Sequence, residues 1–158
     1  YENGQMIYAD SNKYTNGKEY LTKSGKKVYG GGGIMPDIFV PIDTSHFQRN
    51  VTQLYLDGTF GNFVYQYYSK RLPQFNQYTS PADFTKHYTG VEDAWTQLVN
   101  YALKDSINLK NVPAKDKDAI QKRLKAYLAR FRWRNQGFYE VLNANDPVVQ
   151  KAIQELAK

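Results

Sequence analysis

The chain has 158 residues, 41% of them hydrophobic and 23% charged, which suits one folded domain with its own core and argues against a disordered tail. It carries a net charge of +6 and no cysteine, so a disulfide framework, a thiolate zinc site and a cysteine nucleophile are excluded. A positive surplus of this size more often serves solubility than nucleic-acid binding. The chain starts at Tyr1 without a secretory leader or a long apolar run, so we expect an internal piece of a longer gene product.

The first 41 residues predict a small β segment, because they are rich in Gly, Tyr, Asn and Lys and contain short β-prone runs. Residues 19–22 and 27–29 are expected to be the two strands of a hairpin. Residues 23–26 join them, and Gly25 tolerates the positive φ that such a turn needs.

A third short strand is expected at residues 37–40, between Pro36 and Pro41, which cannot donate to a strand ladder and so mark its ends. The glycine run at 30–33 fits neither the spacing of a dinucleotide-binding loop nor that of a P-loop. We interpret it as a tight chain crossing where no side chain fits, rather than as a phosphate site.

Helical periodicity dominates from residue 44 onward and predicts five or six helices. Helix starts are indicated by an N-cap at Thr44 or Ser45 and by N-cap and first-turn pairs at Ser80–Pro81 and Asp146–Pro147, and a break is indicated at residues 58–61. An amphipathic helix is expected from 91 to about 105. A long helix is expected from 114 to 142, with Gly137 as the expected point of interruption. The fold class is therefore mainly α, a helical bundle at 44–158 preceded by a β segment at 1–43.

The residues that could carry chemistry do not form a recognisable site. His46 and His87 lie on different expected helices without carboxylates at metal spacing, which favours surface or capping roles. Ser24 with Lys26 or Lys27 could form a serine and lysine dyad, but a surface turn offers neither burial nor oxyanion donors. We therefore assign no catalytic, cofactor-binding or metal-binding residue and expect no cofactor.

A basic and aromatic run at residues 122–134 resembles an RNA-binding stretch, but its six basic residues spread around the helix outside the apolar stripe. A solvated outer face accounts for it better than nucleic-acid binding. Trp133 is the exception, because it points away from the stripe and should be covered by another element or by a partner. Trp133, Arg132 and Arg134 are the candidate docking residues.

Most of the chain resembles one known family. The segment from Tyr20 through GGGGIMPDIFVPIDT, ending at Thr44, is similar to the segment that follows the catalytic core in C-terminal processing serine peptidases, also called tail-specific proteases. The form with four glycines resembles the gram-negative envelope members, and LKAYLAR at 124–130 resembles their helical tail. Lys26 stands where the family usually has Arg, which keeps the charge but loses a bidentate fork. The residues that match the family motif are Gly25, Gly30, Gly31, Gly32, Gly33, Pro36 and Asp37.

The resemblance implies that a serine nucleophile, its lysine base and a PDZ-like module lie upstream in a parent endopeptidase of the periplasm or cell envelope. No catalytic residue carries over, so the chain is expected to be inactive alone, with a helical appendage that acts as a scaffold or docking surface. The implied partners are the rest of the parent peptidase and, through it, protein substrates, but no nucleic acid. The alternatives are an independent helical interaction module and, third, a basic nucleic-acid binder.

A further expectation concerns residues 1–41, which would pair with a sheet of the parent peptidase that lies outside this chain. Residues 1–18 should be mobile, and residues 19–41 should pack back on the helices or mediate self-association, because an unpaired strand edge offers free N–H and C=O groups.

Overall fold

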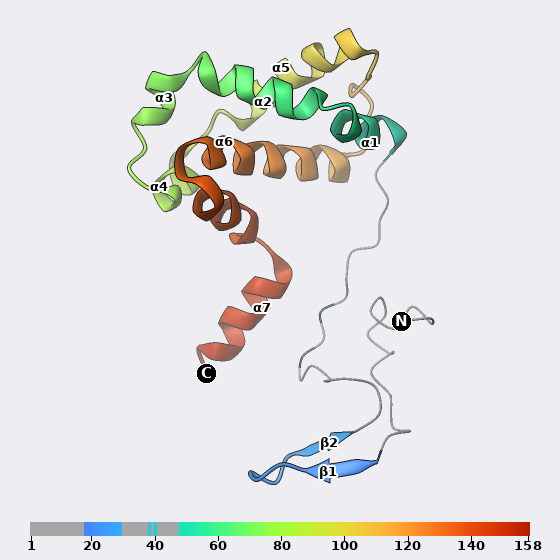
Figure 1. Ribbon diagram of the computed structural model, residues 1–158, viewed down its shortest axis with the longest axis vertical. Coiled ribbons are helices and arrows are strands. Elements are labelled where there is room, and N and C mark those ends of the chain that lie inside the picture. Colours follow the sequence, from blue (N-terminus) through green and yellow to red (C-terminus); the bar gives the residue numbers. More distant parts are fainter. Residues whose placement is uncertain (1–17, 30–37, 39, 41–47) are drawn as a thin grey trace. The chain divides into compact units, whose positions relative to one another are not determined.

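The computed structural model describes residues 18–29, 38, 40 and 48–158 (Figure 1). The chain divides into two compact units, residues 1–46 and residues 47–158, and each is described here by itself. The predictions for residues 1–17, for the glycine run and for Thr44, Ser45 and His46 fall outside the described residues.

A β-hairpin is the regular structure of the first unit. Strands β1 (Glu19–Leu21) and β2 (Lys27–Tyr29) are antiparallel, with Tyr20 opposite Val28. The turn closes through hydrogen bonds from Gly25 N to Thr22 O and from Thr22 N to Lys26 O, both at 2.9 Å, and Gly25 has a φ of 81°. The predicted hairpin and the positive φ at Gly25 are confirmed.

The predicted third strand at 37–40 is not supported. Only Ile38 and Val40 of that segment are described, and neither lies in a strand.

The second unit is helical, which confirms the predicted mainly α class. Its described residues form the following elements: α1 (Arg49–Leu56), α2 (Thr59–Ser69), α3 (Leu72–Asn76), α4 (Pro81–His87), α5 (Val91–Ala102), the 3-10 helix η2 (Leu103–Asp105), α6 (Ala114–Asn143) and α7 (Pro147–Leu156). The short α3 is the helix that periodicity did not predict.

Side-chain caps start two of these helices as the sequence predicted. Ser80 Oγ accepts from Asp83 N at 3.1 Å at the start of α4, and Asp146 Oδ1 accepts from Val148 N at 2.9 Å at the start of α7. Helix α1 begins at Arg49 after Gln48, which has no side-chain cap, and the residues predicted as its N-cap, Thr44 and Ser45, lie outside the described residues. Gln48 N donates instead to the buried Asp116 at 3.4 Å, so a tertiary bond replaces the local cap.

The core of the second unit forms where α2, α5 and α6 pack on one another and α4 packs on α6. The helical period places its apolar residues on the inward faces. The largest fully buried side chains are those of Phe75, Phe84, Leu54, Leu98, Ile107, Leu109, Ile120, Leu124 and Leu128. Trp95 is also buried, as the amphipathic pattern of residues 91–105 predicts.

The chain reverses within α6, which joins two helical limbs (Figure 1). The non-helical residues are Trp133, with φ −118° and ψ 16°, and Arg134, with φ 56° and ψ −141°. The predicted interruption at Gly137 is therefore misplaced by three residues. Gly137 is buried within the second limb, and a Cβ added there would lie 2.9 Å from the carbonyl oxygen of Ala129 on the first limb. Its lack of a side chain lets the two limbs approach.

Helix α7 contrasts with the others because none of its residues is buried. Val148, Ile153 and Leu156 are exposed, although the sequence of α7 is amphipathic.

Candidate functional site

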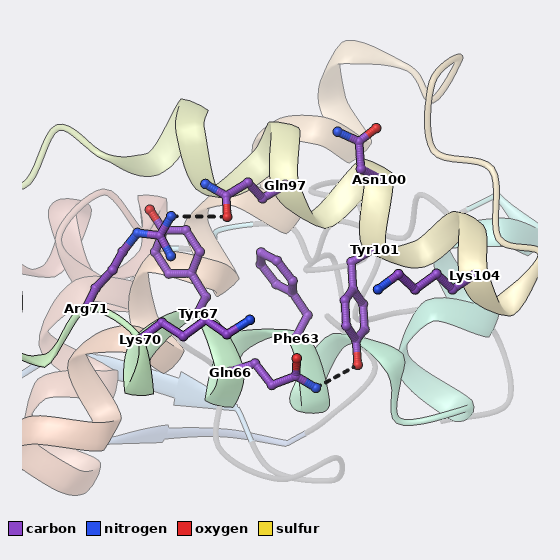
Figure 2. A pocket seen from close by; sticks show the side chains of 9 residues that line it. All are labelled: Phe63, Gln66, Tyr67, Lys70, Arg71, Gln97, Asn100, Tyr101 and Lys104. Atoms are coloured by element: carbon purple, nitrogen blue, oxygen red, sulfur yellow. Dashed lines mark hydrogen bonds between the residues drawn. The ribbon is translucent and has the colours of Figure 1, made fainter.

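A groove of about 240 Å³ runs between α2 and α5, and we call it the α2–α5 groove (Figure 2). Three aromatic rings lie side by side between the two helices: Phe63 and Tyr67 from α2 and Tyr101 from α5. The ring centroid of Phe63 lies 5.6 Å from that of Tyr67 and 5.5 Å from that of Tyr101. Phe63 and Tyr67 are also members of the buried core, so the floor of the groove is fixed by the packing of the fold.

Two polar pairs cross the groove. The residue that comes earlier in the chain on the α2 side pairs with the later residue on α5, so the two helices run antiparallel along the groove. Gln66 Nε2 donates to Tyr101 Oη at 3.1 Å, and Arg71 donates from a terminal nitrogen to Gln97 Oε1 at 3.1 Å (Figure 2). These bonds tie the walls together at two levels.

At one end of the groove, Arg71 is held over Tyr67. The guanidinium carbon lies 3.9 Å from the ring centroid, and a terminal nitrogen lies 3.8 Å from Asp93 Oδ2. Asp93 also accepts from the Tyr67 hydroxyl at 2.8 Å and from Gln97. Hydrogen bonds from Tyr67 and then Gln97 hold the pKa of Asp93 below its usual value, while burial raises the pKa of Tyr67 and keeps it a donor. The charge of Arg71 is thus offset by a neighbouring carboxylate.

The other two cations of the groove are not offset in this way. Lys70 and Lys104 are exposed, and the Lys104 ammonium lies 5.3 Å from the centroid of the Tyr101 ring. The residues that line the groove include three cations and no carboxylate: Phe63, Gln66, Tyr67, Lys70, Arg71, Gln97, Asn100, Tyr101 and Lys104. The α2–α5 groove therefore combines an aromatic floor with a positive rim in which Asp93 offsets only Arg71.

A second hollow, of about 450 Å³, lies at the reversal of α6 and is lined by Tyr127, Arg130, Phe131, Arg134 and Asn135. Phe131 was expected on the buried stripe but is 42% exposed, and it stacks on Tyr68 with centroids 5.0 Å apart. Arg130 lies 5.6 Å from the centroid of the Phe138 ring. This hollow is also basic and aromatic, but the five residues that line it all come from α6.

Of the three candidate docking residues, only Arg134 is exposed. Arg132 donates to Asn76 Oδ1 at 2.7 Å and to Tyr78 O at 3.2 Å, which ties α6 to the last residue of α3 and to the segment that follows it. The Trp133 ring lies 5.8 Å from that of Phe84 and is partly buried against the core, so another element covers it, as expected.

The expectation of a solvated basic face is wrong at Lys125. Its ammonium donates to Thr85 O at 2.8 Å and to Tyr88 O at 3.4 Å, at the carboxyl end of α4. Partial burial lowers the pKa of Lys125.

The residues that match the family motif fall mostly outside the described residues. Gly25 lies in the hairpin turn, beside Ser24, whose hydroxyl lies 3.0 Å from that of Thr22. Nothing is described for Gly30, Gly31, Gly32, Gly33, Pro36 or Asp37.

A serine, an aspartate and a histidine meet at α4, but they form a helix cap. His87 Nδ1 lies 2.7 Å from Asp83 Oδ1, while Asp83 Oδ2 accepts from Thr79 N at 2.9 Å. The Ser80 hydroxyl accepts from Asp83 N and has no bond to the imidazole. Nucleophilic catalysis needs a bond between nucleophile and base, so this cluster serves the helix. His87 was expected in a surface or capping role, and it is an exposed side chain that pairs with Asp83 one turn earlier, which fits the surface role.

No group of three His, Cys, Asp or Glu side chains in the described part of the chain could hold a metal ion. None of the helices in that part is long and apolar enough to cross a membrane.

Sequence reasoning did not single out the α2–α5 groove. A signal was present, because each cation follows an aromatic residue by one helical turn: Lys70 and Arg71 follow Tyr67, and Lys104 follows Tyr101. That spacing predicts a shared face, but not that two such faces meet.

The comparisons with known proteins identify a family without an assigned function. No curated protein and no solved structure matches the chain. The model of a family of unknown function, DUF8443, matches residues 50–135, which is more than half of the chain and includes all residues that line the α2–α5 groove. The chain belongs to this family, DUF8443.

Proposed function

We propose that the chain is the C-terminal, non-catalytic portion of a C-terminal processing serine endopeptidase, whose helical unit serves as a scaffold or docking surface. The observation that carries the proposal is the hairpin of β1 and β2. Its turn is formed by Thr22, Ser24 and Gly25, the residues through which the chain resembles the segment after the catalytic core. The resemblance also favours the periplasm or cell envelope as the location.

The helical unit supports the docking part of the proposal. Its buried core is drawn from residues 51–141, so the unit has the packing of a self-contained module. Two concave basic and aromatic surfaces lie on it, the α2–α5 groove and the hollow at the reversal of α6.

An independent helical interaction module is the second candidate, favoured by the same self-contained core. A nucleic-acid binder is less well supported, because Lys125 and Arg132 of the basic run are engaged in bonds to backbone carbonyls. Those two side chains are not free to contact phosphates.

The reading frame upstream of the Tyr1 codon tests the peptidase proposal. We expect it to encode a serine and lysine pair with catalytic spacing and a PDZ-like stretch. An upstream frame that encodes unrelated domains, or none, would leave the independent module as the better account.

A protein-level test uses a serine-directed fluorophosphonate. We expect the product of the whole gene to be labelled and the 158-residue chain to remain unlabelled, because no serine hydroxyl among its described residues is bonded to a histidine, a lysine or a carboxylate. Labelling of the 158-residue chain that is lost when one of its serines is replaced would overturn the non-catalytic assignment.

A further inference from the structure

We propose that the α2–α5 groove binds an extended acidic peptide segment, with carboxylates that reach the cations at its two ends. This inference rests on the proposed docking role of the helical unit, and it does not depend on the parent being a peptidase.

Charge complementarity favours an anionic occupant. Three cations and no carboxylate line the groove, and Asp93 offsets only Arg71. Lys70 and Lys104 have no ion pair with a described residue, so their charges remain available to a ligand. Opposite charges at the rim of a site mainly supply attraction and register.

The distance between the cations favours a short extended segment. The two available cations are Lys70 and Lys104. The bond between Gln66 and Tyr101 sets a common level on the two antiparallel helices. Lys70 lies four residues beyond that level in one direction and Lys104 lies three residues beyond it in the other. At a rise of about 1.5 Å per residue, the two cations are about 10 Å apart along the groove. An extended peptide covers that distance in about three residues at roughly 3.3 Å each. Two acidic residues separated by two others would therefore meet both ends.

The walls suit a peptide backbone. Asn100 and Gln66 line the groove with amide groups, which have both donors and an acceptor, and one donor of Gln66 is bonded to Tyr101. The amide of Gln97 is already engaged by Asp93 and Arg71. The N–H and C=O groups of an extended chain alternate and can use both kinds of partner.

The floor is less suited to nucleic acid. Base binding needs open aromatic faces, but Phe63 and Tyr67 are 5% and 3% exposed, and Arg71 covers the Tyr67 ring. A nucleic acid would find the cations, but of the three rings only Tyr101 is partly exposed, and the Lys104 ammonium lies 5.3 Å from its centroid.

The test measures binding of a fluorescein-labelled hexapeptide, Gly-Asp-Ser-Gly-Asp-Gly, by fluorescence anisotropy at low salt. The comparison ligands are the same peptide with both Asp residues replaced by Asn, and a single-stranded oligothymidylate. We expect the acidic peptide to bind about twofold to thirtyfold more tightly than the neutral peptide, the range that two exposed charge pairs contribute, and more tightly than the oligothymidylate. Amide chemical shifts should move at residues 66–71 and 97–104.

The matched variants are Lys70→Gln with Lys104→Gln, and Lys86→Gln with Lys110→Gln, which removes the same charge from exposed lysines outside the groove. We expect only the first pair to weaken binding of the acidic peptide, by about twofold to thirtyfold. Equal weakening by both pairs would show general charge attraction and overturn the site. Tighter binding of the oligothymidylate, or equal binding of the neutral peptide, would overturn the proposed ligand. The upstream reading frame is unaffected by any of these results, so the two proposals fail separately.

Discussion

Lys125 shows at the residue scale how tertiary structure changes the role of a charged side chain. On α6 alone it belongs to a basic run that points to solvent, but α4 ends where its ammonium can reach two carbonyl oxygens. The last carbonyls of a helix have no partners within it, and a cation satisfies them well. The sequence could not predict this bond, because it depends on two elements about 40 positions apart.

We predict that Lys125→Ala lowers the free energy of unfolding by about 1–3 kcal/mol, because it removes two charge-assisted bonds and leaves partly buried carbonyls without a donor. Lys125→Met should cost less, since its stem still covers the rings of Phe84 and Tyr88, which lie within 5.9 Å of the ammonium. Urea denaturation gives both values, and the exposed Lys86→Ala is the control. Equal midpoints for Lys125→Ala and Lys86→Ala would show that the carbonyl bonds contribute nothing measurable.

Asp93 carries a second prediction at the same scale, on pH. Its pKa is lowered in the folded chain, chiefly by the bond from Tyr67, so the folded state favours the carboxylate. The resulting stability is present above the unfolded pKa of about 3.9 and is lost as the pH falls through the lowered folded value. We expect Asp93→Asn to flatten the fall in Tm between about pH 5 and pH 2 that the wild-type chain shows. The exposed Asp118→Asn is the matched control, and an identical flattening in it would mean that the Tyr67 bond is not the cause.

At the scale of the element, α6 separates what local sequence predicts from what it does not. Its apolar stripe predicted a long helix, and Gly137 was expected to interrupt it because Gly is a weak helix former. The reversal occurs instead at Trp133 and Arg134, and Gly137 remains helical because it lies against Ala129. The glycine serves a contact between the two limbs, which no local propensity encodes.

Gly137→Ala should therefore destabilise the chain by about 1–3 kcal/mol, although Ala is the better helix former, because the added methyl group would lie 2.9 Å from a backbone oxygen. Gly61→Ala is the matched control in α2, where no atom lies within 4 Å of the added Cβ, and it should stabilise by about 0.5–1 kcal/mol. Thermal denaturation distinguishes the two signs. Stabilisation by both substitutions would show that the limbs are not in close contact.

The elements that could be predicted are those with local signals. The hairpin followed from a glycine turn, α4 and α7 from their capping pairs, and α5 from its amphipathic stripe. The five-residue α3 was missed because Pro73 lies in it and its single buried residue, Phe75, shows no periodicity. The α2–α5 groove was missed for a similar reason, since neither helix contains a motif that encodes their antiparallel contact.

For the whole molecule, the position of the buried core in the chain determines which part can fold by itself. Every member of the described core lies between Val51 and Val141, and α1 to α6 all contribute to it. The first unit contributes a hairpin, and residues 19–28 of that hairpin are exposed. Burial of apolar surface is the main favourable contribution that offsets the loss of chain entropy on folding. Residues 47–158 supply this burial for the helical unit.

Deletion of residues 1–46 should accordingly leave the unfolding of the helical unit unchanged. This prediction favours self-association of residues 19–41 over the other expected outcome, that they pack back on the helices. A two-stranded hairpin is marginal by itself, and its unfolding exposes little additional surface. We expect the urea midpoint and the m-value of the truncated chain to match those of the full chain within about 10–15%, the usual error of such extrapolations. The m-value is the sharper measure, because it scales with the surface that unfolding exposes. A lower m-value with an unchanged helical circular dichroism signal would mean that residues 1–46 bury substantial surface in the full chain. Loss of the cooperative transition would mean that the helical unit cannot fold without them.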